Sequence, residues 1–170
     1  LRMTIDIAMT IVLIGLMAYS LIGTLTHEIL GTAMFVLFIV HHILNRKWFG
    51  ALSKGRYRSF RTFQTVLVFL LIGTVLASAI SGIILSEHVF TFLHISKGAS
   101  VARSVHMVCA YLNYILILRH LGLHWNVMLG AMSKGKDRKK TTDLVLRAGA
   151  IAIAAYGVYA FIRRQIGEYL

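Results

Sequence analysis

The chain has 170 residues, of which 58% are hydrophobic and 14% charged, and its formal net charge is +12. A mean hydropathy of +0.75, with several apolar runs of the roughly 20 residues needed to cross about 30 Å of hydrocarbon, excludes an ordinary soluble domain. A nucleic-acid partner would need a soluble basic face. Basic loops beside apolar runs instead suit anionic lipid headgroups. We therefore expect an integral membrane protein in contact with lipid and no nucleic-acid partner.

Five apolar runs predict membrane-spanning helices. The chain has no proline and lacks the alternating pattern of a barrel, so helices are the economical way to satisfy backbone polar groups in lipid. The first run lacks the cleavage site of a secretory signal and is expected to remain as a helix. We predict an all-α integral membrane protein that forms one domain over residues 1–170. The expected helices cover 5–25, 27–48, 61–85, 104–125 and 142–162, with a tight turn at 23–26 between the first two.

Lysine and arginine crowd two of the connections between these runs. By the positive-inside rule both connections face the cytoplasm, so the amino terminus is also cytoplasmic and the 86–103 connection is external. Two arginines after the fifth run disagree with this orientation, but they are outnumbered. The crowded cations are Arg46, Lys47, Lys54, Arg56, Arg58 and Arg61 in the first connection, and Lys134, Lys136, Arg138, Lys139 and Lys140 in the second.

Two pairs of histidines share one spacing. His27 and His41 are fourteen residues apart, and so are His106 and His120. Fourteen residues turn an α-helix through about 1400°, within roughly 40° of whole turns, and rise about 21 Å. The second and fourth runs point the same way because one reversing helix separates them. If they face one another, they form two stacked bis-histidine sites, an outer one from His27 and His106 and an inner one from His41 and His120.

A bis-histidine site between parallel helices fits haem b. The chain has no Cys-x-x-Cys-His motif, so we expect two haems held non-covalently, with four of the five helices forming a haem-binding bundle. Zinc is disfavoured because each pair supplies only two of four ligands. Ionisable side chains inside spans are rare and point to function. For His42, His88 and His94, contact with lipid headgroups is the better interpretation.

Two other histidines compete for the inner site. His124 lies eighteen residues after His106 and aligns with it better than His120 does. Those eighteen residues rise about 27 Å, which would expose a haem at the membrane surface. His42 is further round its helix from the face of His27 than His41 is. We therefore prefer His120 to His124 and His41 to His42 as ligands.

Weaker candidates surround these histidines. Gly31 follows His27 by one turn, where a missing side chain would let a macrocycle approach, although close helix packing explains it equally well. Gly15, Gly73 and Gly82 are similar candidates on the flanking helices. The propionates of the outer haem could be neutralised by Arg103 and Lys97. Those of the inner haem could be neutralised by Arg119 together with Arg46, Lys47, Arg58 and Arg61. Polar residues near the outer site could handle protons of a quinol: Glu28, Glu87, His88, His94 and Arg103.

At this point the chain resembles a known family. The strings are His27-Glu-Ile-Leu-Gly31, His41-His-Ile-Leu-Asn-Arg-Lys-Trp48, Ser81-Gly-Ile-Ile-Leu-Ser86, and the stretch from His106 to His120-Leu-Gly-Leu-His-Trp125. They are similar to a prokaryotic membrane family, catalogued as a domain of unknown function and related to diheme b-type cytochromes, over roughly residues 4–130. Members are associated with flavin-based extracellular electron transfer. The resemblance implies a prokaryotic cytoplasmic membrane and a flavoprotein as redox partner. The same histidine spacing also occurs in respiratory cytochrome b and in ferric reductase-like proteins.

Two functions follow as hypotheses. The first is a diheme b-type cytochrome that transfers electrons across the cytoplasmic membrane, from the quinone pool to a flavoprotein or another external acceptor, either as a quinol-linked oxidoreductase or as the electron-transfer subunit of one. Direct oxidation of NADPH is disfavoured, because no segment of the chain is suited to a nucleotide-binding domain. The alternative is a membrane anchor or sensor subunit of a redox complex, in which haem is structural or absent.

Overall fold

The computed structural model describes residues 1–95 and 97–132 and, beyond these, residues 144, 148, 149, 151, 155, 159 and 163. The chain divides into two compact units, Leu1–Leu123 and His124–Leu170, and helix α5 (Ala99–Met132) runs across their boundary. The expectation of a helix over 142–162 falls almost entirely outside the described residues. The described part is all-helical and contains no strand.

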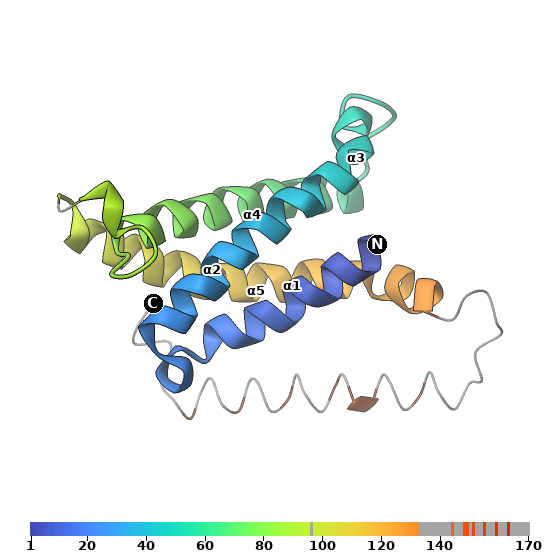
Figure 1. The fold of residues 1–170 in the computed structure, drawn as a ribbon. Coiled ribbons are helices and arrows are strands. Elements are labelled where there is room, and N and C mark those ends of the chain that lie inside the picture. Colours follow the sequence, from blue (N-terminus) through green and yellow to red (C-terminus); the bar gives the residue numbers. More distant parts are fainter. Residues whose placement is uncertain are drawn as a thin grey trace. The chain divides into compact units, whose positions relative to one another are not determined.

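Residues 1–132, apart from residue 96, form five α-helices and one 3-10 turn in chain order (Figure 1). Helices α2, α4 and α5 are long, whereas α1 is shorter and α3 has only 6 residues. The 3-10 turn η1 lies in the connection between α4 and α5. The bounds are Arg2–Met17 for α1, Tyr19–Leu44 for α2, Arg46–Ala51 for α3, Ser59–Ile84 for α4, Thr91–Leu93 for η1 and Ala99–Met132 for α5.

Among the described residues, three helical segments are long and apolar enough to cross a membrane. They are Tyr19–Leu44, Ser59–Ile84 and Ala99–His124, each of 26 residues. Helix α1 has 16 residues and so extends about 24 Å, short of the roughly 30 Å of a hydrocarbon core. The three spans confirm a membrane-type helical protein, while the full set of five spans and the four-helix haem bundle stay predictions.

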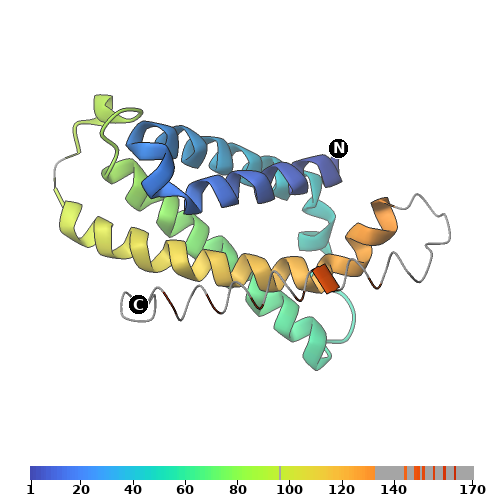
Figure 2. The same cartoon turned by 90° about the horizontal axis from the view of Figure 1, so that it is seen from below.

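The break between the first two long helical stretches includes Gly23, within the turn expected at 23–26. Helix α1 ends at Met17, earlier than expected, and Ala18 leads into a short helical turn at the start of α2. Gly23 has φ 75°, a conformation that glycine adopts without a Cβ clash, and it interrupts the helical geometry near the start of α2. Helix α1 then packs back along α2 (Figure 2). The packing is tight at Gly15, where a Cβ would lie 2.9 Å from Leu30 Cδ1.

The end of α2 also differs from the expected span, which reached residue 48. Helix α2 ends at Leu44, and Asn45 caps it by donating from Nδ2 to the His41 carbonyl over 2.9 Å. The chain then enters α3, which carries the first cations of the basic connection. The additional turn separates these charges from the apolar span.

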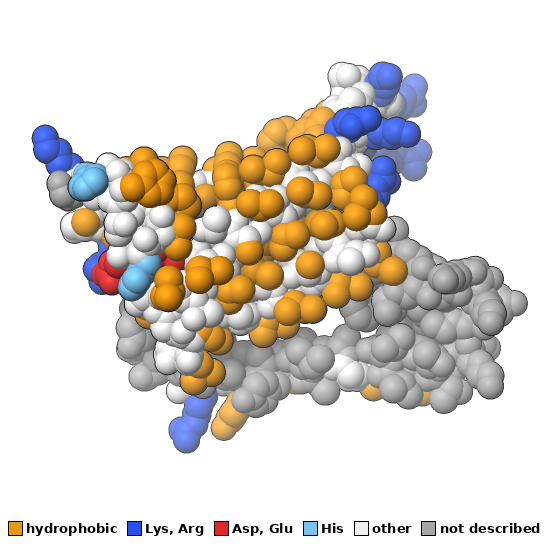
Figure 3. Space-filling model, viewed as in Figure 1, with side chains coloured by type: hydrophobic (Ala, Val, Ile, Leu, Met, Phe, Trp, Pro, Cys, Tyr) orange, Lys and Arg blue, Asp and Glu red, His pale blue; other side chains and the backbone are white. Residues whose placement is uncertain are grey.

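Apolar side chains cover the flanks of the long helices. Figure 3 shows them spread along the length of the molecule, with Lys and Arg gathered at the end that holds α3. Exposed examples include Leu21 at 86%, Phe60 at 60% and Val101 at 69%. Contact with membrane lipid is the environment in which such a surface is stable.

Candidate functional site

The rings of His27 and His106 meet between α2 and α5. Their centroids are 6.1 Å apart and their planes make an angle of 73°. Close backbone packing in the described residues is mainly that of α1 on α2 and of α2 on α4, so α2 and α5 meet here through side chains. The first predicted histidine pair is therefore brought together, although 79 positions separate its members in the sequence.

Helix α4 fixes the orientation of the His106 ring. His106 Nδ1 lies 3.0 Å from the Ser78 carbonyl and 3.2 Å from Ser81 Oγ. Because a carbonyl only accepts, Nδ1 carries the hydrogen, and Nε2 is left with the lone pair. Gly82 packs against the same ring, since a Cβ there would lie 3.3 Å from His106 Cε1. A metal-binding histidine is typically held through its other nitrogen in this way.

His27 completes the pair from the opposite side. Its ring is half-buried, with the Tyr19 ring edge-on at 5.1 Å. Its Nδ1 is buried and has no hydrogen-bond partner. His27 therefore lacks the kind of hydrogen bond that orients the His106 ring.

A buried amide lies two turns further along α5. Asn113 is 7% exposed and is seven residues from both His106 and His120. Its Nδ2 donates to Ser78 Oγ over 3.0 Å and to the Thr74 carbonyl over 3.3 Å, while its Oδ1 is buried without a partner. Ser78 thus joins Asn113 to the His106 ring, and the polar contact between α4 and α5 is continuous.

His41, at the other end of α2, has a carboxylate partner. Its Nδ1 lies 2.8 Å from Asp6 Oδ1 on α1, with side-chain exposures of 25% and 34% respectively. A carboxylate that accepts from Nδ1 fixes the tautomer and leaves Nε2 as the electron-pair donor. At this end of α2 the His41 imidazole therefore also has its Nδ1 held by the protein and its Nε2 available as a ligand atom.

The other histidines of this end are placed differently. His120 is half-buried on α5, and its pairing with His41 stays a prediction. His42 bonds through Nδ1 to the Phe38 carbonyl over 2.8 Å, and its ring centroid is 4.2 Å from that of Phe38. His124 is exposed and belongs to the second unit.

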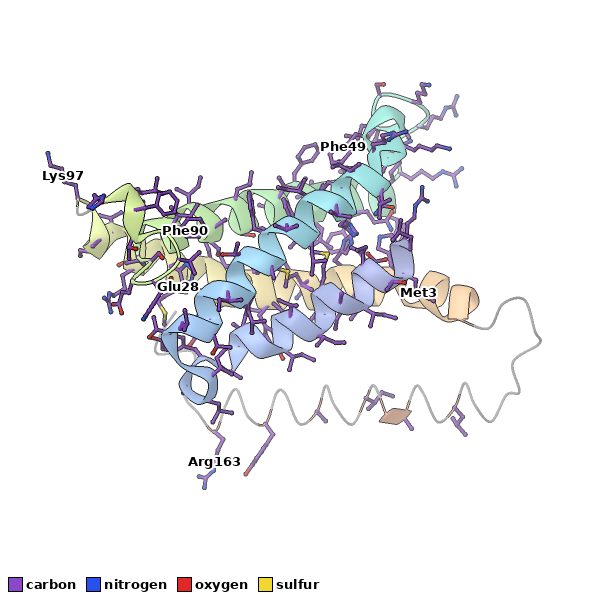
Figure 4. All side chains as sticks on the ribbon, in the orientation of Figure 1. Met3, Glu28, Phe49, Phe90, Lys97 and Arg163 are labelled. Carbon is purple, nitrogen blue, oxygen red and sulfur yellow. The ribbon has the colours of Figure 1, made fainter. Side chains whose placement is uncertain are left out.

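The connection after α4 is anchored by Glu28, the neighbour of His27. The Glu28 side chain is only 10% exposed. It accepts hydrogen bonds from Ser86 Oγ over 2.6 Å and from the backbone amides of residues 87, 88 and 89 over 2.8, 3.1 and 2.8 Å. Figure 4 places Glu28 at the same end of the molecule as Phe90 and Lys97. Glu28 therefore holds the loop that covers the His27 end of the helices, and its carboxylate is already occupied.

The weaker sequence candidates have mixed settings. A Cβ on Gly31 would meet nothing within 4 Å, so Gly31 does not mark a tight helix contact in the described part of the chain. Arg103 and Arg119 are both exposed on α5. His88 and His94 lie exposed in the loop after α4, where His88 Nδ1 is 3.4 Å from Glu28 Oε1.

These residues fit a haem better than a metal ion held by protein alone. Since metal–nitrogen bonds are about 2 Å long, the 6.1 Å between the ring centroids of His27 and His106 is compatible with one metal atom held between two imidazoles. The described residues contain no group of three or more His, Cys, Asp or Glu that could hold a bare ion. Haem needs only two protein ligands because the macrocycle supplies the other four.

Several supporting residues escaped the sequence prediction. Asp6 is a lone carboxylate in the first apolar run, and the cost of an ionisable group there could have identified it. Ser78 and Ser81 were recognisable only as polar positions four and seven residues after Thr74, on one face of α4. Asn113 was recognisable in a similar way, as a polar residue midway between His106 and His120 in an apolar run.

Comparison of the chain with protein-family models, with characterised proteins and with solved structures found no match.

Proposed function

We propose that this protein is a diheme b-type cytochrome that transfers electrons across a membrane, with His27 and His106 as axial ligands of one haem and His41 and His120 as those of the other. The observation that carries the proposal is the meeting of the His27 and His106 rings, with the Nδ1 of His106 tied to α4. The shared fourteen-residue spacing extends it to the second pair.

The protein's own residues would bind, orient and shield the two groups. Ser78 and Asp6 fix the tautomers of His106 and His41 so that each Nε2 offers its lone pair. Glu28 closes the loop over the His27 end. When bound, haem supplies reversible one-electron chemistry. The protein's contribution lies in the axial ligands, their hydrogen bonds and the apolar surroundings.

Quinol is the proposed donor, and a flavoprotein or another external acceptor the proposed partner. A membrane helix bundle has direct access to a lipid-soluble donor. The test is stopped-flow mixing of purified, oxidised protein with reduced menaquinone or ubiquinone analogues. We expect a b-type absorption band to appear on mixing, while NADH and NADPH give none. Rapid reduction by NADH, or none by any quinol, would contradict quinol-linked transfer.

The ligand pairing has a separate test. His27→Ala and His106→Ala should each remove the same one of two haems, and the double variant should remove no more. His41→Ala and His120→Ala should remove the other. His42→Ala is the matched control, because its Nδ1 bonds within α2 and both haems should remain. Retention of both haems after His120→Ala, with loss after His124→Ala, would contradict the inner pair.

A second candidate function is that of a membrane anchor or sensor subunit of a redox complex. The four hydrogen bonds from residues 86–89 to Glu28 hold this end of the molecule rigid, which suits a structural role. A reduced-minus-oxidised spectrum distinguishes the two. An anchor without bound haem gives no band, and structural haem gives a band that quinol does not change.

A further inference from the structure

The connection between α2 and α4 concentrates positive charge without any internal counterion. Six cations lie between residues 46 and 61, and the sequence has no Asp or Glu between Glu28 and Glu87. Figure 3 shows these cations gathered at the end that carries α3. In the described residues no ion pair neutralises these cations, so the segment carries a local excess of positive charge.

Arg61, in the first turn of α4, is the organised member of this group. It donates from Nη2 to the Ala51 carbonyl over 2.6 Å, and its guanidinium lies 4.4 Å from the centroid of the Tyr57 ring. Tyr57 in turn donates to the Leu52 carbonyl over 2.6 Å. Gly55, at φ +81°, brings the loop to within contact of Arg61, where a Cβ would lie 3.1 Å from Nη1. The loop thus wraps the guanidinium and holds it in one place.

Arg61 is half-buried, and no carboxylate pairs with it in the part of the chain that the structure describes. A guanidinium has five donor hydrogens, and one of them goes to Ala51. A positioned but unpaired guanidinium at the start of a long helix, where the helix dipole is positive, favours an anion with several acceptor oxygens.

A cleft of about 360 Å³ adjoins this guanidinium and is open on one side. Its walls include Trp48 and Leu52 as apolar surfaces and Lys54, Arg61, Gln64 and Thr65 as polar groups. The volume falls at the lower end of the range for small-molecule sites. Two cations, an amide and a hydroxyl around an aromatic side chain suit a phosphate attached to an apolar body.

We infer that this cleft binds the headgroup phosphate of an anionic phospholipid, with Arg61 and Lys54 as the charged contacts and Trp48 beside the upper acyl region. A lipid is favoured over a free phosphate because the cleft lies at the end of two apolar spans and includes an indole, a side chain that prefers the membrane interface. This inference does not depend on haem.

The test is lipid binding to the full chain in detergent, measured by native mass spectrometry with phosphatidylglycerol and with phosphatidylcholine. We expect the wild type to prefer phosphatidylglycerol. Arg61→Gln and Lys54→Gln should each weaken that binding about fivefold or more. Arg56→Gln is the matched control, since it removes the same charge from the same loop but lies outside the cleft. Its binding should remain within a factor of two of the wild type.

Other outcomes would overturn the inference. Equal loss in all three variants would indicate general attraction to a basic loop, and no preference between the two lipids would exclude the site. Binding of inorganic phosphate that depends on Arg61 and Lys54, without any lipid preference, would assign the cleft to a free anion. Circular dichroism of each variant checks folding. If Arg61→Gln fails to fold, Lys54→Gln alone tests the site, because Lys54 is exposed and its replacement should not disturb the fold.

Discussion

The two proposed haem sites differ in the hydrogen-bond partner of one ligand histidine. The Nδ1 of His106 faces a neutral carbonyl, whereas that of His41 faces the Asp6 carboxylate. A carboxylate partner makes an imidazole a stronger electron donor, which favours the oxidised state of a bound iron. The two proposed haems should therefore have different midpoint potentials, with the lower potential at His41.

Replacing Asp6 tests this difference. Asp6→Asn keeps the size of the side chain but removes the charge that His41 faces, so the midpoint potential of one haem should rise while that of the other stays constant. Haem affinity at the affected site should fall by about 10- to 100-fold. An optical redox titration measures the two potentials, and titration of the haem-free protein with haem measures the affinity. Glu28→Gln is the control, since it removes a carboxylate at the other end of α2, and any effect should fall on the other haem.

At the level of helices, the contact between α4 and α5 consists largely of polar groups that hold the His106 ring. Ser81 at 3% and Asn113 at 7% are among the most buried residues described, beside Leu67 at 3% and Ala102 at 5%. Polar contacts between apolar helices fix their register, because each partner would otherwise face hydrocarbon. The register of α4 against α5 thus determines where His106 lies.

Gly82 provides a steric test of that contact. Gly82→Val would force side-chain atoms against His106, whose Cε1 lies 3.3 Å from the position of a new Cβ. We expect the haem bound by His106 to be lost or its spectrum altered. Gly73→Val is the matched control on the same helix, because a Cβ there meets nothing within 4 Å. Unchanged spectra in both variants would contradict the proposed position of the site.

The loop after α4 offers a test that does not involve haem. Glu28→Ala removes the acceptor of three consecutive amides, and hydrogen bonds to a charged group are worth about 1.5–3 kcal/mol. Hydrogen exchange of the amides of residues 87–89 should accelerate by about one to two orders of magnitude, as measured by mass spectrometry of the corresponding peptides. Glu87→Ala is the control, because only the backbone of Glu87 takes part. Equal exchange in both variants would contradict the anchoring role.

Across the whole molecule, the features that could be predicted from the sequence are those that repeat along a single helix. Hydropathy and length predicted the three long spans, and the fourteen-residue spacing predicted that His27 and His106 share a level. Features that depend on contacts between distant segments were missed. The bond between Asp6 and His41 joins residues 35 apart, and Glu28 bonds to amides about 60 residues away. No periodicity encodes such contacts.

The errors at the helix ends have local causes. The first helix ends early because Ala18 departs from helical geometry at φ −91° and ψ 29°, five residues before Gly23 breaks the helix at φ 75° and ψ 174°. The second span ends early because Asn45 caps it and starts a separate short helix. Apolar residues continue through the first point, so hydropathy alone could not place that end, whereas Asn45, Arg46 and Lys47 mark the second end in the sequence.

The number of haems per chain is the most direct measure of the proposed cytochrome. A pyridine haemochrome assay on purified protein, from cells supplied with a haem precursor, relates haem b to protein concentration. Two bis-histidine sites predict two acid-extractable haems per chain, falling to about one in His27→Ala and in His106→Ala. A value of one in the wild type would contradict the inner site, and a value of zero would contradict the cytochrome altogether.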